Sequence, residues 1–201
     1  MKKINSPRFA YKTAGILLLF TLASCGSVPV SSMYKLRNFD IQTTNLAKFY
    51  AAVRIPQSLS LREKAVAVEL GFSSKEAGIK FKERIYFQQY DNISSPALKA
   101  EKRAGYKVST YRMSESDAEK MRQTRARVNK LRKQHSDGKG SLSIVANTCR
   151  HGELPAGPLY LSTYIKSDEL DDFVVLVLDA DIKKIVVSEK DLEEIPLCGN
   201  S

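Results

Sequence analysis

Histidine and cysteine are scarce in this chain, which has two histidines and three cysteines among its 201 residues. His135 and His151 do not lie at a spacing typical of zinc ligands, so we expect no metal site and no cofactor. The sequence also holds no Gly-x-Ser-x-Gly elbow, phosphate-binding loop or dinucleotide fingerprint. We therefore do not predict an enzyme; lysine-based or acid-based chemistry, which leaves weak sequence traces, is the alternative.

The chain lacks an apolar run long enough to cross a membrane. The apolar run near the N-terminus, residues 14–23, is ten residues long, whereas a transmembrane helix needs about 20. Four cations precede it: Lys2, Lys3, Arg8 and Lys12. This order is typical of a signal peptide, which we predict for residues 1–24. An ordinary secretory signal with a coincidental cysteine, or a buried apolar N-terminal helix, is the alternative.

Leu22-Ala23-Ser24-Cys25 resembles a bacterial lipobox, because small residues lead directly into a cysteine after the apolar run. The resemblance implies a diacylglycerol thioether on Cys25, cleavage before it and acylation of the new amine. Two or three acyl chains anchor a protein stably, at about 0.8 kcal/mol per buried CH₂. Residues 25–33 are then a lipidated tether. Gly26, in place of aspartate, favours the outer over the inner membrane by the sorting rule of enterobacterial lipoproteins.

Lipidation of Cys25 would leave an even pair of cysteines, Cys149 and Cys198. Because a lipoprotein reaches an oxidising periplasm, we predict a disulfide between them. In the chain-entropy model, closing this loop of about 50 residues contributes on the order of 4 kcal/mol. A reactive thiol at Cys149, next to a cation and an imidazole in the sequence, is the alternative.

Alternation of apolar and polar residues predicts a mainly β protein. The pattern covers six segments: residues 49–55, 66–72, 79–87, 106–112, 142–148 and 159–165. A seventh segment, 173–178, is apolar on both faces, as a central strand would be. Turn signals lie at 71–74, 94–96 and 155–158. About seven short strands favour a single sandwich-like antiparallel domain over residues 34–201.

One basic helix is expected within this domain, near residues 115–135, so that the class is α+β. Ser116 and Glu119 match a capping box, and Asp137 with Gly138 ends the helix. A narrow apolar stripe is expected to dock on the sheet: Ala118, Met121, Val128 and Leu131.

Charge is distributed unevenly along the chain, with a net of +12 over residues 25–135 and −6 over residues 136–201. The helix supplies one row of cations: Arg122, Arg125, Arg127, Lys130, Arg132 and Lys133. The segment 79–87 supplies a second row: Lys80, Lys82 and Arg84. If the two rows are adjacent they form one basic, anion-binding face; a solvated surface neutralised by the acidic C-terminal third is the alternative.

A basic face on a tethered envelope protein has anionic partners within reach: lipid headgroups, lipopolysaccharide phosphates, acidic polysaccharides and acidic proteins. Each Lys or Arg near a membrane adds about 1 kcal/mol of attraction to anionic lipid, and salt weakens it. Nucleic acid is not expected, because the compartment is wrong and no aromatic-interleaved binding motif is present.

A second charged cluster is acidic: Asp168, Glu169, Asp171 and Asp172. Its place between two expected strands predicts an exposed polar turn. Ligation of Ca²⁺ by these oxygens is the alternative.

The stretch Met33-Tyr34-Lys35-Leu36 and residues 51–56, 157–160 and 162–165 resemble those of uncharacterised putative lipoproteins of Gram-negative bacteria. That family has no assigned activity, so the resemblance implies a location in the cell envelope but no biochemical activity. We predict a periplasm-facing, lipid-anchored envelope lipoprotein with a non-enzymatic binding or assembly role. An accessory subunit of an envelope transport or export complex is the alternative, which an exposed apolar patch beside the basic face would favour.

Overall fold

The structure is a computed structural model that describes residues 29–91, 94–185 and 195–199. The predicted signal peptide and Cys25 lie outside these residues. The strands are β1 (Tyr50–Pro56), β2 (Leu59–Ser74), β3 (Ile79–Tyr86), β4 (Gln88–Gln89), β5 (Tyr106–Arg112), β6 (Lys139–Arg150), β7 (Tyr160–Lys166) and β8 (Val174–Asp181). The helices are α1 (Val30–Leu36), the 3₁₀ helix η1 (Leu46–Lys48), α2 (Pro96–Ala100), α3 (Glu115–Gln134) and α4 (Ile182–Ile185). None of these helices is long and apolar enough to span a bilayer.

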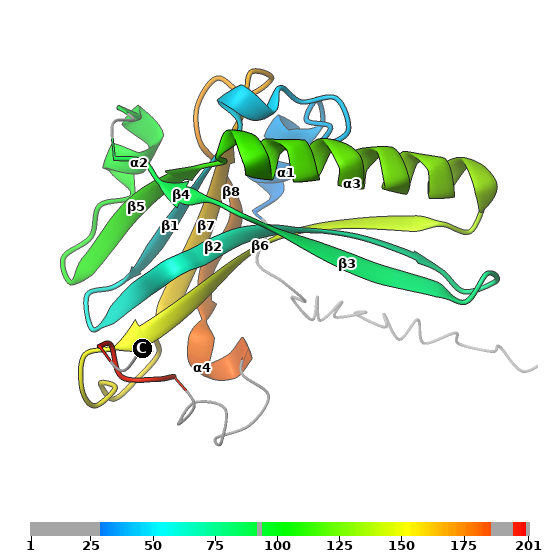
Figure 1. The fold of residues 1–201 in the computed structure, drawn as a ribbon. Helices are drawn as coiled ribbons and strands as arrows, with labels where there is room; N and C mark the ends of the chain where they lie inside the picture. Colours follow the sequence, from blue (N-terminus) through cyan, green and yellow to red (C-terminus); the bar gives the residue numbers. More distant parts are fainter. Residues whose placement is uncertain (1–28, 92–93, 186–194, 200–201) are drawn as a thin grey trace, which may run out of the picture.

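The strands form two antiparallel sheets in a sandwich-like arrangement, as the alternating pattern predicts (Figure 1). Five strands follow the order β4-β5-β1-β7-β8, and three follow the order β3-β2-β6. All seven expected segments are strands, and the described residues add only the two-residue β4. The mainly β class is therefore confirmed.

One expected turn, at residues 71–74, is instead part of a strand. Strand β2 continues through Ser74, which pairs with Ile79. Asp137 explains where the chain does turn, because its carboxylate accepts hydrogen bonds from the Ser74 hydroxyl and from the next two backbone amides. The turn residues at 71–74 did not predict this position, because the turn is held by Asp137, which lies 63 positions from Ser74.

The main hydrophobic core lies between the two sheets and α3. Alternate residues of β1, such as Val53, and of β2, such as Leu70, meet Met121 and Val128 of the helix there. A smaller cluster covers the opposite, outer face of the five-stranded sheet, where Leu98 of α2 contributes to packing around β1 and β7. Burial on both faces fits the apolar composition of the central strands.

Helix α3 lies across the three-stranded sheet, which it contacts at all three strands (Figure 1). The expected stripe is confirmed, since Ala118, Met121 and Val128 are buried and Leu131 packs against the core. The expected cap at Ser116 is wrong by two residues. Ser114 caps the helix by accepting a hydrogen bond from the amide of Asp117, because the chain enters α3 directly after β5.

The two ends of the described chain are both attached to the sandwich. Residues 30–33 of the expected tether are helical, because they begin α1, whose Leu36 packs against the core. The sulfur atoms of Cys149 and Cys198 lie 2.10 Å apart, which confirms the predicted pair at disulfide distance. The pair holds the C-terminal segment beside the end of β6, where the Cys198 amide donates to the Arg150 carbonyl.

Candidate functional site

The two predicted rows of cations lie on opposite faces of the three-stranded sheet. Phe81 and its partner Phe72 lie on the core side of the sheet. Arg84 follows Phe81 by three residues, and because successive side chains of a strand point to opposite faces, Arg84 and its partner Glu69 lie on the other side. The guanidinium of Arg127 lies 4.1 Å from the ring centroid of Phe81, so α3 covers the Phe81 side. The condition for one basic face, that the two rows are adjacent, is therefore not met.

Two of the three cations of the β3 row share one carboxylate of the same sheet. Arg84 and Lys82 pair with Glu69 at 2.5 and 3.4 Å. The hydrogen bond from Arg84, more than that from Lys82, holds the pKa of Glu69 below its ordinary value against a weaker effect of burial. Lys80, the third cation of the row, is exposed.

The helix row is divided between structural and free cations. Arg125 is buried and donates to the backbone carbonyl of Thr44 at 2.9 Å, and its burial lowers its pKa. Arg122 pairs with Glu115 and Glu119, both at 2.7 Å. Arg127 is exposed and lies over the Phe81 ring. Three further cations are exposed and, among the described residues, have neither an ion-pair partner nor an aromatic one: Lys130, Arg132 and Lys133. We call these three the α3 cationic end.

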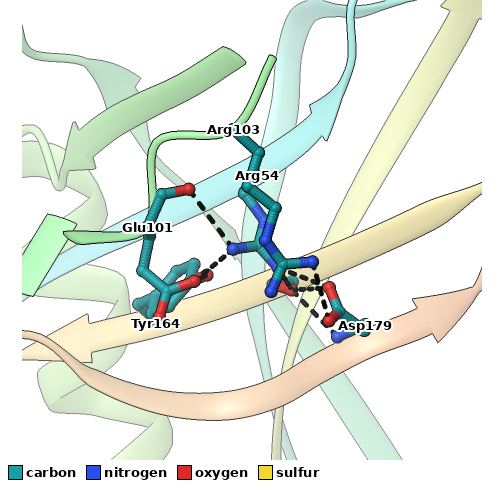
Figure 2. A network of polar contacts seen from close by, with 6 residues as sticks. Arg54, Glu101, Arg103, Tyr164 and Asp179 are labelled. Atoms are coloured by element: carbon teal, nitrogen blue, oxygen red, sulfur yellow. Dashed lines mark hydrogen bonds and ion pairs between the residues drawn. The ribbon is translucent and has the colours of Figure 1, made fainter. Parts of the chain in front are cut away.

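The outer face of the five-stranded sheet holds a charged network that sequence reasoning missed. Arg54 of β1 is fully buried, and its two terminal nitrogens reach Glu101 and Asp179 (Figure 2). One of these nitrogens also donates to the Ser162 hydroxyl at 2.9 Å. The phenol of Tyr164 donates to Glu101 at 2.9 Å. Three strands and the segment after α2 are thereby tied together.

This network is balanced in charge, since Arg103 also pairs with Asp179, at 3.0 Å. Burial first, and then the hydrogen bond to Glu101, raise the pKa of Tyr164, so its phenol stays protonated at neutral pH. Asp179 adopts a left-handed backbone with φ 49°, which the surrounding contacts hold. Of the three guanidinium nitrogens of Arg54, only Nε is buried without a hydrogen-bond partner in the described structure. A cluster whose charges balance has no free base or nucleophile, so we assign it a structural role.

A cleft of about 390 Å³ opens at the other end of the same outer face, a volume near the lower limit for small-molecule sites. Its lining residues are Lys48, Tyr50, Tyr90, Ser94, Lys166, Ser167 and Asp168. The rings of Tyr50 and Tyr90 stack with centroids 6.2 Å apart, and Arg112 lies over Tyr90.

The polar groups of the cleft are mostly paired with one another. Lys48 pairs with Asp168 at 3.2 Å, and Lys166 approaches Asp172 at 4.0 Å. The hydroxyl of Ser167 is buried without a hydrogen-bond partner in the described structure. Aromatic faces and paired ammonium groups can contact a small polar molecule, but the lining residues form no nucleophile–base pair.

The acidic segment beside this cleft is only partly the exposed turn that we expected. Asp168, Glu169 and Asp171 are exposed, but Asp172 is half-buried and accepts hydrogen bonds from Ser95 and from the Ala97 amide at the start of α2. Burial alone would raise the pKa of Asp172, but these hydrogen bonds hold it below its ordinary value. Within the described residues, no group of three acidic, histidine or cysteine side chains could hold a metal ion.

No protein-family model, curated protein or solved structure matches this chain. The resemblance to Gram-negative lipoproteins therefore stays a prediction.

Proposed function

We propose that the protein is a periplasm-facing lipoprotein, anchored through Cys25 to the outer membrane in preference to the inner, that binds phosphate-bearing envelope lipid without catalysing a reaction. The lipobox and the signal-like segment support the address. The observation that carries the binding role is the α3 cationic end, in which three exposed cations fall within four residues and have no ion-pair partner among the described residues.

The α3 cationic end stays positively charged because the acidic side chains of α3 lie far from it along the helix. Glu119, the acid of α3 closest in sequence to the cluster, precedes Lys130 by eleven residues, which is about 16 Å along the axis. The Debye length at physiological ionic strength is about 8 Å, so such an acid is largely screened. Asp137, just beyond the helix, keeps its negative charge, but its carboxylate is held by the Ser74 hydroxyl and two backbone amides and forms no ion pair with the cluster.

Phosphate is the anion that this cluster suits best in the expected compartment. Three exposed cations near an anionic surface contribute about 3 kcal/mol of attraction, and this attraction weakens with salt. Anionic phospholipid and lipopolysaccharide both present phosphate groups, so binding experiments must separate them.

Vesicle flotation tests this role with a soluble form that begins at residue 26. Vesicles of neutral lipid, of neutral lipid with phosphatidylglycerol, and of neutral lipid with lipopolysaccharide form the three arms. We expect binding only in the anionic arms, with the arm that binds more tightly identifying the lipid. The triple variant Lys130→Glu, Arg132→Glu, Lys133→Glu should weaken it by about 100-fold or more, given about 1 kcal/mol for each cation lost.

A matched control reverses the same number of exposed cations elsewhere, at Lys80, Lys99 and Lys102. Its net charge is identical to that of the helix variant, so a specific role of α3 predicts clearly tighter residual binding for the control. Equal losses in the two variants would show that only net charge matters. Binding in no arm, or equal binding to neutral vesicles, would overturn the proposed role and leave an acidic protein as the partner to seek.

A further inference from the structure

Helix α1 exposes three large side chains on one side. Val30, Met33 and Tyr34 are 83%, 62% and 65% exposed. Their spacing of three and four residues places them on one helical face. We call them the α1 stripe.

The opposite side of α1 is attached to the domain. Ser32 is buried, Leu36 packs against the main core, and the helix contacts β8, the edge strand of the five-stranded sheet. The stripe is therefore an outward face of a fixed helix and takes no part in the core. A fixed helix transmits its orientation to the domain that it is packed on.

Two cations follow the stripe along the chain. Lys35 is exposed, and the guanidinium of Arg37 lies 4.0 Å from the ring centroid of Tyr34. Apolar and aromatic side chains beside lysine and arginine are the combination found where a helix lies in the headgroup region of a bilayer. A tyrosine suits that region because its ring is apolar and its hydroxyl is polar.

The length of chain before α1 determines what the stripe can reach. Val30 follows Cys25 by five residues, and five fully extended residues span roughly 17 Å. If Cys25 is acylated, as the proposed function requires, α1 cannot leave the vicinity of the membrane surface. The headgroup region on each side of a bilayer is itself about 6 Å thick.

We propose that the α1 stripe inserts into the headgroup region of the membrane that holds the lipid anchor. The inference rests on the proposed function for the anchor alone. Anchor and stripe together make two attachments to one surface, so the sandwich is held in one orientation and does not swing on a long linker. The partner that the α1 stripe contacts is therefore the bilayer.

The absence of tryptophan from the chain allows a direct test. Tyr34→Trp introduces a single reporter at the stripe, and Ala77→Trp places a matched reporter at the exposed turn between β2 and β3. Each full-length variant is produced in bacterial cells, extracted from membranes, checked by mass spectrometry for acylation at Cys25 and reconstituted into vesicles with brominated acyl chains. We expect emission of the reporter at position 34 to be blue-shifted and quenched by about twofold, with position 77 unaffected.

A second pair of substitutions separates insertion from mere proximity. Val30→Asp with Met33→Asp, added to Tyr34→Trp, should abolish quenching while circular dichroism and acylation stay unchanged, because carboxylates oppose burial in the headgroup region. Quenching that persists in this variant would overturn the inference.

The remaining outcomes distinguish the two proposals. Acylated protein with an unquenched, red-emitting reporter at position 34 would overturn membrane insertion and leave the anchor intact. A blue-shifted reporter without quenching would also overturn it, in favour of a protein partner on α1. Absence of acylation at Cys25 would overturn both the proposed anchor and this inference.

Discussion

Substitution of Arg54 tests how much its buried ion pairs contribute to the free energy of unfolding. Arg54→Met keeps an unbranched side chain of similar length but removes the charge between Glu101 and Asp179. Removal of one partner from a buried ion pair costs about 3–5 kcal/mol, because the remaining charges lose their compensation. The two carboxylate side chains are 24% and 29% exposed, so water recovers part of that cost. We therefore expect a loss of about 3 kcal/mol in the free energy of unfolding, at the lower end of that range.

Urea unfolding followed by circular dichroism at neutral pH measures this loss. Arg103→Met is the matched control, because it removes a cation from the same Asp179 at a side chain that is 47% exposed. Exposed pairs contribute less than about 1 kcal/mol, so the control should change little. In the triple variant Arg54→Met, Glu101→Gln, Asp179→Asn, part of the loss should be recovered, since no carboxylate is then left unpaired. A loss below about 1 kcal/mol for Arg54→Met, or one equal to that of Arg103→Met, would show that the buried pairs of Arg54 contribute no more than exposed pairs do.

Two further predictions concern packing and pH. A Cβ on Gly138 would lie 2.6 Å from a phenylalanine ring of β2, whereas one on Gly140 would meet nothing within 4 Å. Because an overpacked site destabilises the fold, Gly138→Ala should lower the free energy of unfolding by about 1–3 kcal/mol in urea titrations. Gly140→Ala should lower it clearly less. Burial and a neighbouring carboxylate raise the pKa of Tyr164 above its ordinary value of 10.0, so the stabilisation by its protonated form is complete below pH 10 and is lost as the pH rises beyond it. The unfolding free energy of Tyr164→Phe should consequently fall less steeply above pH 10 than that of the unsubstituted protein, and parallel curves would contradict the assignment.

Much of the fold follows from patterns that repeat over a few residues. Alternation along residues 106–112 predicts β5 at its observed bounds, because period two depends only on neighbouring side chains and one buried face. The stripe of α3 is readable for the same reason at a period of 3.6. Predictions based on turn residues did less well, because Asp137 clamps the turn after β2 from far along the chain.

The fates of individual charges were not predictable from local sequence. Arg54 follows the polar phase of its strand and gives no sign of burial, because its partners lie 47, 108 and 125 positions away. Arg125 occupies a cationic stretch of α3 yet faces the interior. Strand and helix periodicity define faces, but only the packing of elements defines which face meets water.

The amino-acid sequence alone predicts the seven main strands, the basic helix, the pairing of Cys149 with Cys198 and a lipid anchor at Cys25. Each depends on composition, periodicity or an even count of cysteines, all of which are local or additive. Three features are visible only in the folded protein: the two rows of cations face opposite ways, the α3 cationic end has no ion-pair partner among the described residues, and the α1 stripe is exposed. These depend on sheet register and on partners distant in sequence, because the energy of a charge or an apolar group is set by what packs against it.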